Sequence, residues 1–318
     1  MMNIKEKRKA DFVHDTTPVR KIVSEKNNIY IKREDLLPFS FGGNKARKAF
    51  LFFEDIEKGQ YDYVVTYGTS SSNHCRVVSN MAASKGIPCL IIGPKEKSQT
   101  TYNRKLMDLF GAKQIYVPVQ EVHDRIEAEM EQLKKNGYHP YFIEGGGHGN
   151  IGTQAYVDCY QEICEFEKEN GLHFDYIFFA SGTGTTQAGL VCGQLLNHDK
   201  RKIIGISIAR KNPRGRNVVL ESIRSYLKRC SIDISEKDID NATIFLDQYT
   251  DEGYGSQNDE IQRTIHDVLI RYGIPLDPTY TGKAFYGMQE YLKTEKISGR
   301  NILFIHTGGT PLFFDYLA

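Results

Sequence analysis

The stretch Gly42-Gly-Asn-Lys-Ala-Arg-Lys48 joins an alternating, strand-like run, Ile29-Tyr-Ile-Lys32, to an aromatic-rich helix expected over 46–58. Two glycines let the backbone turn tightly and leave open space beside it. A lysine on such a turn lies at the positive end of the helix dipole, which lowers the pKa of its ammonium group. The neutral amine can then attack a carbonyl. Taken alone, however, the stretch is an ordinary glycine turn followed by a basic helical turn.

The composition describes a soluble globular protein that acts on something other than nucleic acid. With 318 residues the chain can bury a sizeable core, and we expect two domains. The net charge of +1 supplies no concentrated basic face. The sequence shows neither a signal peptide nor an apolar run that spans a bilayer, so we expect a cytoplasmic protein without a membrane partner. The six cysteines show no C-x-x-C or zinc-ligand spacing, and we expect no disulfide and no metal.

Short apolar strands alternate with helices along most of the chain. The sequence predicts strands at 63–67, 89–92, 114–117, 141–143, 176–179, 203–208 and 302–305. Short connections between such elements are typical of βα units around a parallel sheet, so the fold class is α/β. Only 234–260 resists assignment, and no linker marks a domain boundary. The domains are therefore expected to share a tight interface.

The loop Ser181-Gly-Thr-Gly-Thr-Thr186 follows one of these strands and opens a helix. Its backbone N–H groups and the helix N-terminus suit a phosphate group. The loop lacks the Walker A pattern of nucleoside triphosphate sites and the G-x-G-x-x-G of dinucleotide sites. A small-residue turn that lets a helix pack closely on the sheet explains it about equally well.

Further loops with polar side chains lie at predicted strand ends, where α/β sheets bind ligands. Ser72-Asn73-His74 follows the strand at 63–67, although an isolated Ser-Asn pair more often caps a helix. No G-x-S-x-G surrounds Ser72, so a hydrolase nucleophile is unsupported. The other loops are Asp251-Glu-Gly-Tyr254, Asp277-Pro-Thr-Tyr-Thr281 and His306-Thr-Gly-Gly309. A lysine amine, a phosphate cradle and hydroxyl groups together suit pyridoxal 5'-phosphate.

In this order and combination the motifs resemble the D-cysteine desulfhydrase and 1-aminocyclopropane-1-carboxylate (ACC) deaminase family. The matching segments are Gly42–Lys48, Ser72–His74, Ser181–Thr186, Leu276–Lys283 and His306–Gly309. The resemblance implies the tryptophan synthase β-like fold (fold type II), with two three-layer αβα domains and the cofactor in the cleft between them. It further implies a large domain of residues 1–47 and 157–318, an inserted small domain of residues 48–156, and a homodimer.

The resemblance also assigns roles to single residues. Lys45 matches the lysine that forms the internal aldimine, and Asn73 matches the residue beside the phenolic oxygen of the cofactor. The phosphate loop corresponds to Gly182, Thr183, Gly184, Thr185 and Thr186. Catalytic or substrate contacts are implied for Ser71, Ser72, Asn73, His74, Tyr254 and Tyr280, and cofactor contacts also for Tyr254, Thr281 and Thr307. Lys48 is interpreted as helix surface.

Thr281 and Thr307 separate the two branches of the family. The deaminase type resembles a pattern with Glu and Leu at these positions, and this chain resembles the desulfhydrase type. A carboxylate keeps the pyridine nitrogen protonated, whereas a threonine hydroxyl can bond to the unprotonated nitrogen, which gives a weaker electron sink. A good β-leaving group needs less delocalisation than a cyclopropane ring. The sequence therefore favours α,β-elimination from a small amino acid, with pyruvate, ammonia and, from D-cysteine, sulfide as products.

Two departures from the family pattern and one basic cluster leave the substrate open. Ser71 stands where the family usually has a long amide, and His148 replaces a small polar residue after three glycines. A basic cluster, Arg210, Lys211, Arg214 and Arg216, is interpreted as a solvated loop rather than a site for a second substrate carboxylate. The alternatives are ACC deaminase, a β-replacement synthase and a non-catalytic cofactor-binding or sensor protein.

Overall fold

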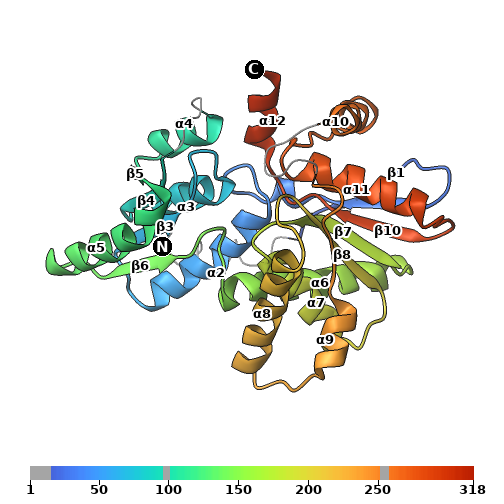
Figure 1. The fold of residues 1–318 in the computed structure, drawn as a ribbon, viewed down its shortest axis with the longest axis horizontal. Coiled ribbons are helices and arrows are strands. Elements are labelled where there is room, and N and C mark those ends of the chain that lie inside the picture. Colours follow the sequence, from blue (N-terminus) through green and yellow to red (C-terminus); the bar gives the residue numbers. More distant parts are fainter. Residues whose placement is uncertain (1–15, 96–100, 251–257) are drawn as a thin grey trace, which may run out of the picture.

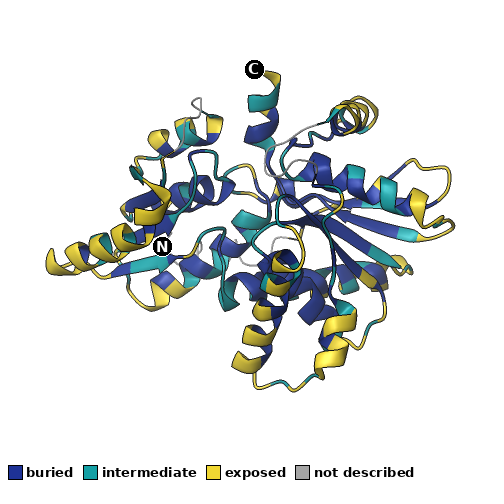
Figure 2. Cartoon of the chain, viewed as in Figure 1, coloured by how far each residue is buried: buried dark blue, intermediate teal, exposed yellow. Residues whose placement is uncertain are grey.

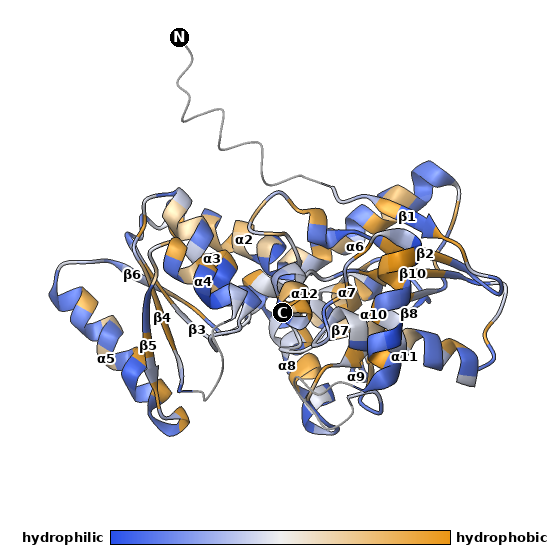
Figure 3. Cartoon of the chain, turned by 90° about the horizontal axis from the view of Figure 1, so that it is seen from above, coloured by the Kyte–Doolittle hydropathy of each residue, from blue (hydrophilic) through white to orange (hydrophobic). Residues whose placement is uncertain are grey.

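The computed structural model describes residues 16–95, 101–250 and 258–318, which form two sheets that lie side by side (Figures 1 and 3). The larger sheet has the order β1 (Val19–Ile22), β2 (Asn28–Lys32), β10 (Asn301–Ile305), β7 (Tyr176–Ser181), β8 (Lys202–Ser207) and β9 (Ile244–Leu246). The smaller sheet has the order β5 (Lys113–Val117), β4 (Cys89–Pro94), β3 (Tyr63–Tyr67) and β6 (Pro140–Ile143). Every strand pair is parallel except the hairpin of β1 and β2.

Helices cover both faces of the larger sheet, because its central strands are apolar on both sides. Ile177 and Phe179 of β7 pack with α6 (Asn150–Asn170), α7 (Thr185–Leu196), α8 (Arg214–Arg229) and α9 (Glu236–Ala242). Phe178 and Ala180 point to the other face, against α10 (Asp259–Tyr272) and α11 (Thr281–Thr294). The central strands are consequently buried on both sides, whereas the outer faces of α8 and α9 are exposed (Figure 2).

The smaller sheet is likewise the middle layer of three. Val64 packs with α2 (Asn44–Lys58), α3 (Asn73–Ser84) and α4 (Tyr102–Leu109), and Val65 faces α5 (Val122–Lys135). Two short 3-10 helices, η1 (Glu34–Leu36) and η2 (Val119–Glu121), complete this region. The C-terminal α12 (Thr310–Leu317) contacts α4, where Asp315 Oδ1 accepts a hydrogen bond from the backbone N–H of Tyr102 at 2.8 Å.

The predicted βα alternation is present, with most boundaries within about three residues of their expected places. The structure adds elements that the sequence did not predict: the antiparallel β1, α12, and both α9 and β9 in the segment left unassigned. All four strands of the smaller sheet fall inside residues 48–156, while the exact domain boundaries stay a prediction. None of the helices among the described residues has the length and apolar character needed to cross a bilayer.

Candidate active site

A cleft of about 1060 Å³ lies between the two sheets. Its lining comes from loops that follow the carboxyl ends of β3, β6, β7, β8 and β10, together with the first turn of α2. This is the edge at which parallel α/β sheets bind their ligands. The cleft brings together most of the predicted site residues: Lys45, Ser72, Asn73, His74, Gly182, Thr183, Gly184, Thr186, Tyr280 and Thr307.

Lys45 lies in the first turn of α2, and its Nζ donates a hydrogen bond to the carbonyl oxygen of Gly146 at 3.0 Å. Burial lowers the pKa of this amine to about 8, with a small opposing contribution from Cys75. The predicted reduction is therefore present, and its largest cause is the loss of water around the ammonium group. At neutral pH a useful fraction of Lys45 is the neutral nucleophile.

Gly42 and Gly43 do not leave room for a ligand, which corrects the sequence interpretation. Their φ angles are +59° and +93°, a region that favours glycine. A Cβ atom on Gly42 would lie 2.5 Å from the carbonyl oxygen of Asp35, and one on Gly43 would lie 2.7 Å from that of Thr307. Gly42 thus allows the chain to pack directly on η1, and Gly43 allows it to pack on the C-terminal motif, where Asn44 N–H also donates to Thr307 O at 3.0 Å.

Two residues of α2 contact the predicted phosphate loop between β7 and α7. Asn44 Nδ2 donates to Thr186 Oγ1 at 3.0 Å, and Lys48 Nζ donates to Thr185 Oγ1 at 2.6 Å. Gly184 has a φ of +98° and precedes the first turn of α7, whose free N–H groups attract anions. The loop, the helix N-terminus and a lysine amine together form a cradle for a phosphate group.

Lys48 is not helix surface, which is a further correction. Its side chain is 1% exposed, and burial together with the charge of Lys45 holds the pKa of its amine well below the usual value. The spacing could have revealed this, because residues three apart on a helix share a face and Lys45 was already assigned to the site.

Ser72 and Asn73 begin α3 directly after β3. Ser72 caps the helix, since its Oγ accepts a hydrogen bond from Cys75 N–H at 3.2 Å. The His74 ring is buried against Thr66 Oγ1 at 2.9 Å, and burial lowers its pKa well below the usual value. The Ser71 hydroxyl contacts Thr69 Oγ1 at 3.2 Å and does not line the cleft. The low pKa keeps the His74 ring uncharged at neutral pH, and the ring stays hydrogen-bonded to Thr66 of β3.

The structure separates the two threonines that distinguish the family branches. Thr307 lines the cleft after β10. Thr281 is fully buried outside the lining, where its hydroxyl donates to Asp277 Oδ1 at 2.8 Å and accepts from Asp277 N–H at 2.9 Å. Tyr280 lines the cleft at the start of α11. Tyr254 lies outside the described residues, and its role stays a prediction.

The cleft also carries ionisable groups from loops of both sheets. His148 lies 3.3 Å from Glu144 Oε2, and burial lowers the pKa of its imidazole. Arg210 donates to Gly182 O at 2.6 Å and lines the cleft, while Arg214 and Arg216 belong to α8. The basic cluster is therefore not a single solvated loop, because Arg210 lines the cleft and donates a hydrogen bond to the predicted phosphate loop.

A buried ion-pair network fixes the orientation of α2. Arg47 donates to both carboxylate oxygens of Glu34 at 2.6 and 2.7 Å and to Glu162 Oε2 at 2.8 Å. Lys32 contacts Glu162 as well, and Glu34 is wholly buried. The two cations and two carboxylates offset the free-energy cost of burying each other's charge. Because this compensation needs close contacts, it favours one orientation of α2. The network ties β2, α2 and α6 together on the side of α2 away from Lys45.

The site as a whole fits a phosphorylated aldehyde. A buried amine of reduced pKa lies beside a glycine-rich cradle that a second lysine supports, and hydroxyl and amide groups line the remaining wall. Pyridoxal phosphate requires these parts. The fold and the site therefore fit an enzyme that uses pyridoxal phosphate, with Lys45 and the 182–186 loop as the predicted contacts of its aldehyde and its phosphate.

Comparison with known proteins agrees, and the chain belongs to the pyridoxal-phosphate-dependent enzyme family, whose model matches residues 12–308. It is 33% identical to D-cysteine desulfhydrase of Yersinia enterocolitica, over 97% of this chain and 96% of that protein. It is 31% identical to D-cysteine desulfhydrase of Serratia proteamaculans, over 99% of both. The crystal structure of an ACC deaminase homologue superposes with a TM-score of 0.85 at 29% identity, covering 96% of this chain and 93% of the homologue.

These comparisons confirm the predicted family, the fold type II architecture, the pyridoxal phosphate cofactor and the class of enzyme, a lyase or deaminase. The roles of single residues stay predictions, which the cleft geometry now makes specific. Sequence reasoning missed Asn44, Lys48 and Gly146, which the fold brings to the cleft or its phosphate loop.

Proposed function

We propose that the protein catalyses α,β-elimination of small amino acids, with D-cysteine as the preferred substrate. The products are pyruvate, ammonia and sulfide, and one water molecule is consumed. The observation that carries the proposal is the buried Lys45 amine, with a pKa of about 8, beside the phosphate cradle in a cleft that also presents Thr307. The D-cysteine desulfhydrase relatives support this choice of substrate.

Each part of the site has a task in this reaction. When bound, pyridoxal phosphate supplies an electron sink for the pair left at Cα. Lys45 removes the Cα proton as a general base, which its low pKa favours at neutral pH. The β-carbon–sulfur bond then breaks, and its electron pair leaves with the thiolate. Ser72 and Tyr280 face the same cleft and are placed to contact the substrate.

Thr307 favours elimination over cyclopropane opening. Among the described residues, the carboxylates that line the cleft are Glu144 and Glu221, and neither comes from the C-terminal motif. A hydroxyl group cannot hold the pyridine nitrogen protonated as a carboxylate does, so the electron sink is weaker. ACC deaminase activity is the second candidate, because the ACC deaminase homologue superposes over nearly the whole chain.

An absorbance scan and two product assays test the proposal. The purified protein, supplied with pyridoxal phosphate, is expected to show a visible band that is absent from Lys45→Ala. D-Cysteine should yield pyruvate and sulfide, whereas ACC should yield no 2-oxobutanoate. A protein without the band after cofactor addition would support a non-catalytic role, and 2-oxobutanoate from ACC would reverse the assignment.

The identity of the leaving group needs a substrate panel. D- and L-amino acids with different β-substituents, each assayed with and without an added thiol, separate elimination from β-replacement. Elimination predicts pyruvate at the same rate in both conditions. A β-replacement synthase would instead consume the thiol and release little pyruvate.

The expected assembly comes from the family resemblance, and the expected location comes from the sequence pattern. We expect a homodimer in the cytoplasm. Light scattering of the purified protein measures the mass of the assembly, and fractionation of the source cells measures its location. A monomeric mass would refute the homodimer.

A further inference from the structure

Arg76 is the largest side chain buried completely in the described structure, and it lies one helical turn after Asn73 in α3. Its Nη1 donates to Asn73 Oδ1 at 2.6 Å and to Asn103 Oδ1 at 2.8 Å. Its Nε contacts Ser40 Oγ at 3.3 Å. A fully buried guanidinium therefore connects the cleft residue Asn73 to the interior of the smaller sheet's helix layer.

These bonds determine which way two amide groups point. Arginine can only donate hydrogen bonds, so the atoms that face Arg76 must be the amide oxygens of Asn73 and Asn103. Asn103 Nδ2 consequently donates to Asn73 Oδ1 at 3.0 Å and to Ser71 O at 2.7 Å. The oxygen of Asn73 thus receives two donors from inside the protein. Its amide nitrogen, which makes no hydrogen bond within the described residues, is left for the cleft.

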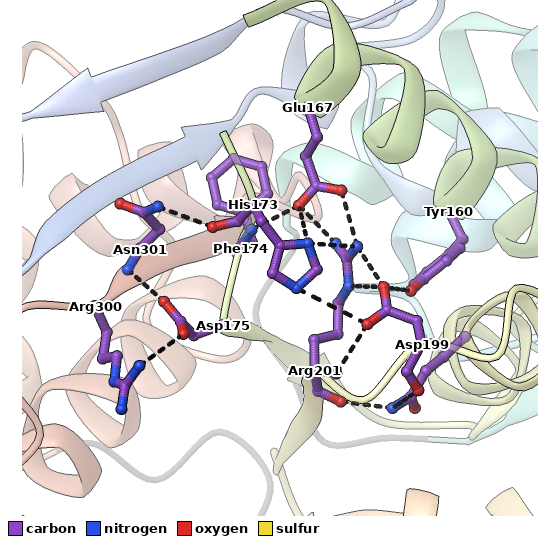
Figure 4. Close-up of polar contacts among 10 residues, drawn as sticks. Tyr160, Glu167, His173, Phe174, Asp175, Asp199, Arg201, Arg300 and Asn301 are labelled. Atoms are coloured by element: carbon purple, nitrogen blue, oxygen red, sulfur yellow. Dashed lines mark hydrogen bonds and ion pairs between the residues drawn. The ribbon is translucent and has the colours of Figure 1, made fainter. Parts of the chain in front are cut away.

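The charge of Arg76 is not balanced by a carboxylate among the described residues. No ion pair among the described residues includes Arg76, and its Nη2 is buried without a hydrogen-bond partner. Burying a charge without a carboxylate partner is costly and does not serve stability. By contrast, the buried Arg201 contacts the carboxylates of both Glu167 and Asp199 (Figure 4). The difference indicates that the charge of Arg76 acts on the cleft.

The chemistry of the cofactor identifies the acceptor. Its ring bears an ionisable hydroxyl beside the carbon that reacts with Lys45, so this oxygen lies near Lys45 Nζ. The residue after Asn73, His74, is close enough to Lys45 for the lysine charge to act on its ring. Asn73 lines the same cleft as Lys45, so its amide nitrogen is a candidate donor to the ring oxygen. An amide N–H donor polarised by a cation stabilises an anionic oxygen more than a neutral amide alone.

We propose that Arg76 is a positioning residue that orients and polarises the Asn73 amide so that Asn73 Nδ2 donates to the anionic ring oxygen of the cofactor. This inference rests on the proposed function, since it requires the cofactor at Lys45. Asn103 acts in the same way from the other side of Asn73 Oδ1. Neither Arg76 nor Asn103 lines the cleft.

The pH titration of the visible band of the cofactor-loaded protein tests the proposal. A donor to the ring oxygen stabilises the deprotonated form, so its loss raises the pH of the spectral midpoint. Arg76→Met is expected to raise the midpoint by about one to two pH units, the equivalent of one charge-assisted hydrogen bond. Asn103→Ala, which retains Arg76, is expected to raise it by a smaller amount.

A double-mutant cycle separates positioning from a direct effect of the charge. Asn73→Ala should raise the midpoint as well, and adding Arg76→Met to Asn73→Ala should change it no further. A further rise in the double variant would show that Arg76 acts directly on the cofactor and would overturn the proposal. If Arg76→Met does not fold, Asn103→Ala alone decides, and an unchanged midpoint there overturns the proposal.

Arg201→Met is the matched control for stability. Arg201 is 5% exposed and precedes β8, at the strand edge opposite the cleft. The Arg201→Met variant is expected to have a lower melting temperature and an unchanged spectral midpoint. If Arg76→Met also lowered the melting temperature and left the spectral midpoint unchanged, the role of Arg76 would be merely structural. A wild-type protein without a visible band would instead contradict the proposed function itself, so the two failures are distinct.

Discussion

Lys48 Nζ lies 2.6 Å from Thr185 Oγ1, although 137 residues separate the two in the sequence. The contact links the helix that carries Lys45 to the predicted phosphate loop, and both side chains are buried. Burial and the charge of Lys45 keep the pKa of the Lys48 amine well below its usual value. A phosphate group would supply the counter-charge that Lys48 lacks, because the pKa of an amine rises beside an anion.

Lys48→Met is expected to weaken pyridoxal phosphate binding by about 10- to 100-fold, the equivalent of one charge-assisted hydrogen bond. The dissociation constant is measured by titrating the apoprotein with cofactor. Lys58→Met, at the exposed end of the same helix, is the control and should bind normally. Equal affinity of the Lys48 variant and the wild type would remove Lys48 from the phosphate site.

The pH dependence of cofactor capture follows from the lowered pKa of Lys45. Only the neutral amine attacks the aldehyde, and it becomes the major form as the pH rises through about 8. The rate of appearance of the visible band should therefore increase about tenfold per pH unit below 8 and level off above it. An ordinary lysine would give a rate that keeps rising toward pH 10. Stopped-flow absorbance measures the profile, and Lys45→Arg should show no band at any pH.

Gly43→Ala tests the close packing between the Lys45 turn and the C-terminal motif. The added Cβ combines an unfavourable φ of +93° with a contact of 2.7 Å to Thr307 O. Gly137→Ala is the control, because its φ is +88° and nothing lies within 4 Å of the added Cβ. We expect Gly137→Ala to cost about 1 kcal/mol of unfolding free energy and Gly43→Ala about 1 to 3 kcal/mol more. Urea unfolding measures both, and equal losses would contradict the packing argument.

The two threonines of the predicted nitrogen site should behave differently when changed to valine. Thr281→Val removes the buried hydroxyl that donates to Asp277 Oδ1 and accepts from Asp277 N–H, and it should lower the free energy of unfolding by about 1 to 3 kcal/mol. Thr307→Val removes a hydroxyl that lines the cleft and should lower kcat about 10-fold with little loss of stability. Denaturant unfolding and steady-state kinetics on each variant separate the two roles. The reverse pattern would return the nitrogen contact to Thr281.

Local patterns were sufficient for the strands, the helices and the lysine, because each depends on neighbouring residues. The phosphate loop and the Ser72–His74 turn were predictable for the same reason, since each directly follows a strand. The features that could not be predicted depend on contacts between residues far apart in the sequence. Lys48 is buried against the loop that contains Thr185, and the close backbone of Thr307 leaves no room for a side chain at Gly43. The different positions of Thr281 and Thr307 could not be predicted either, because Thr281 is held outside the cleft by its hydrogen bond to Asp277.

The central position of β10 has a consequence for biosynthesis. This strand pairs with β2 on one side and with β7 on the other, and Thr307 follows it directly. On the ribosome, β2 and β7 emerge long before the strand that must separate them. The larger sheet, and with it the floor of the cleft, therefore closes only after translation has passed β10. Nascent chains halted before that point are expected to be unable to retain cofactor and to depend on chaperones.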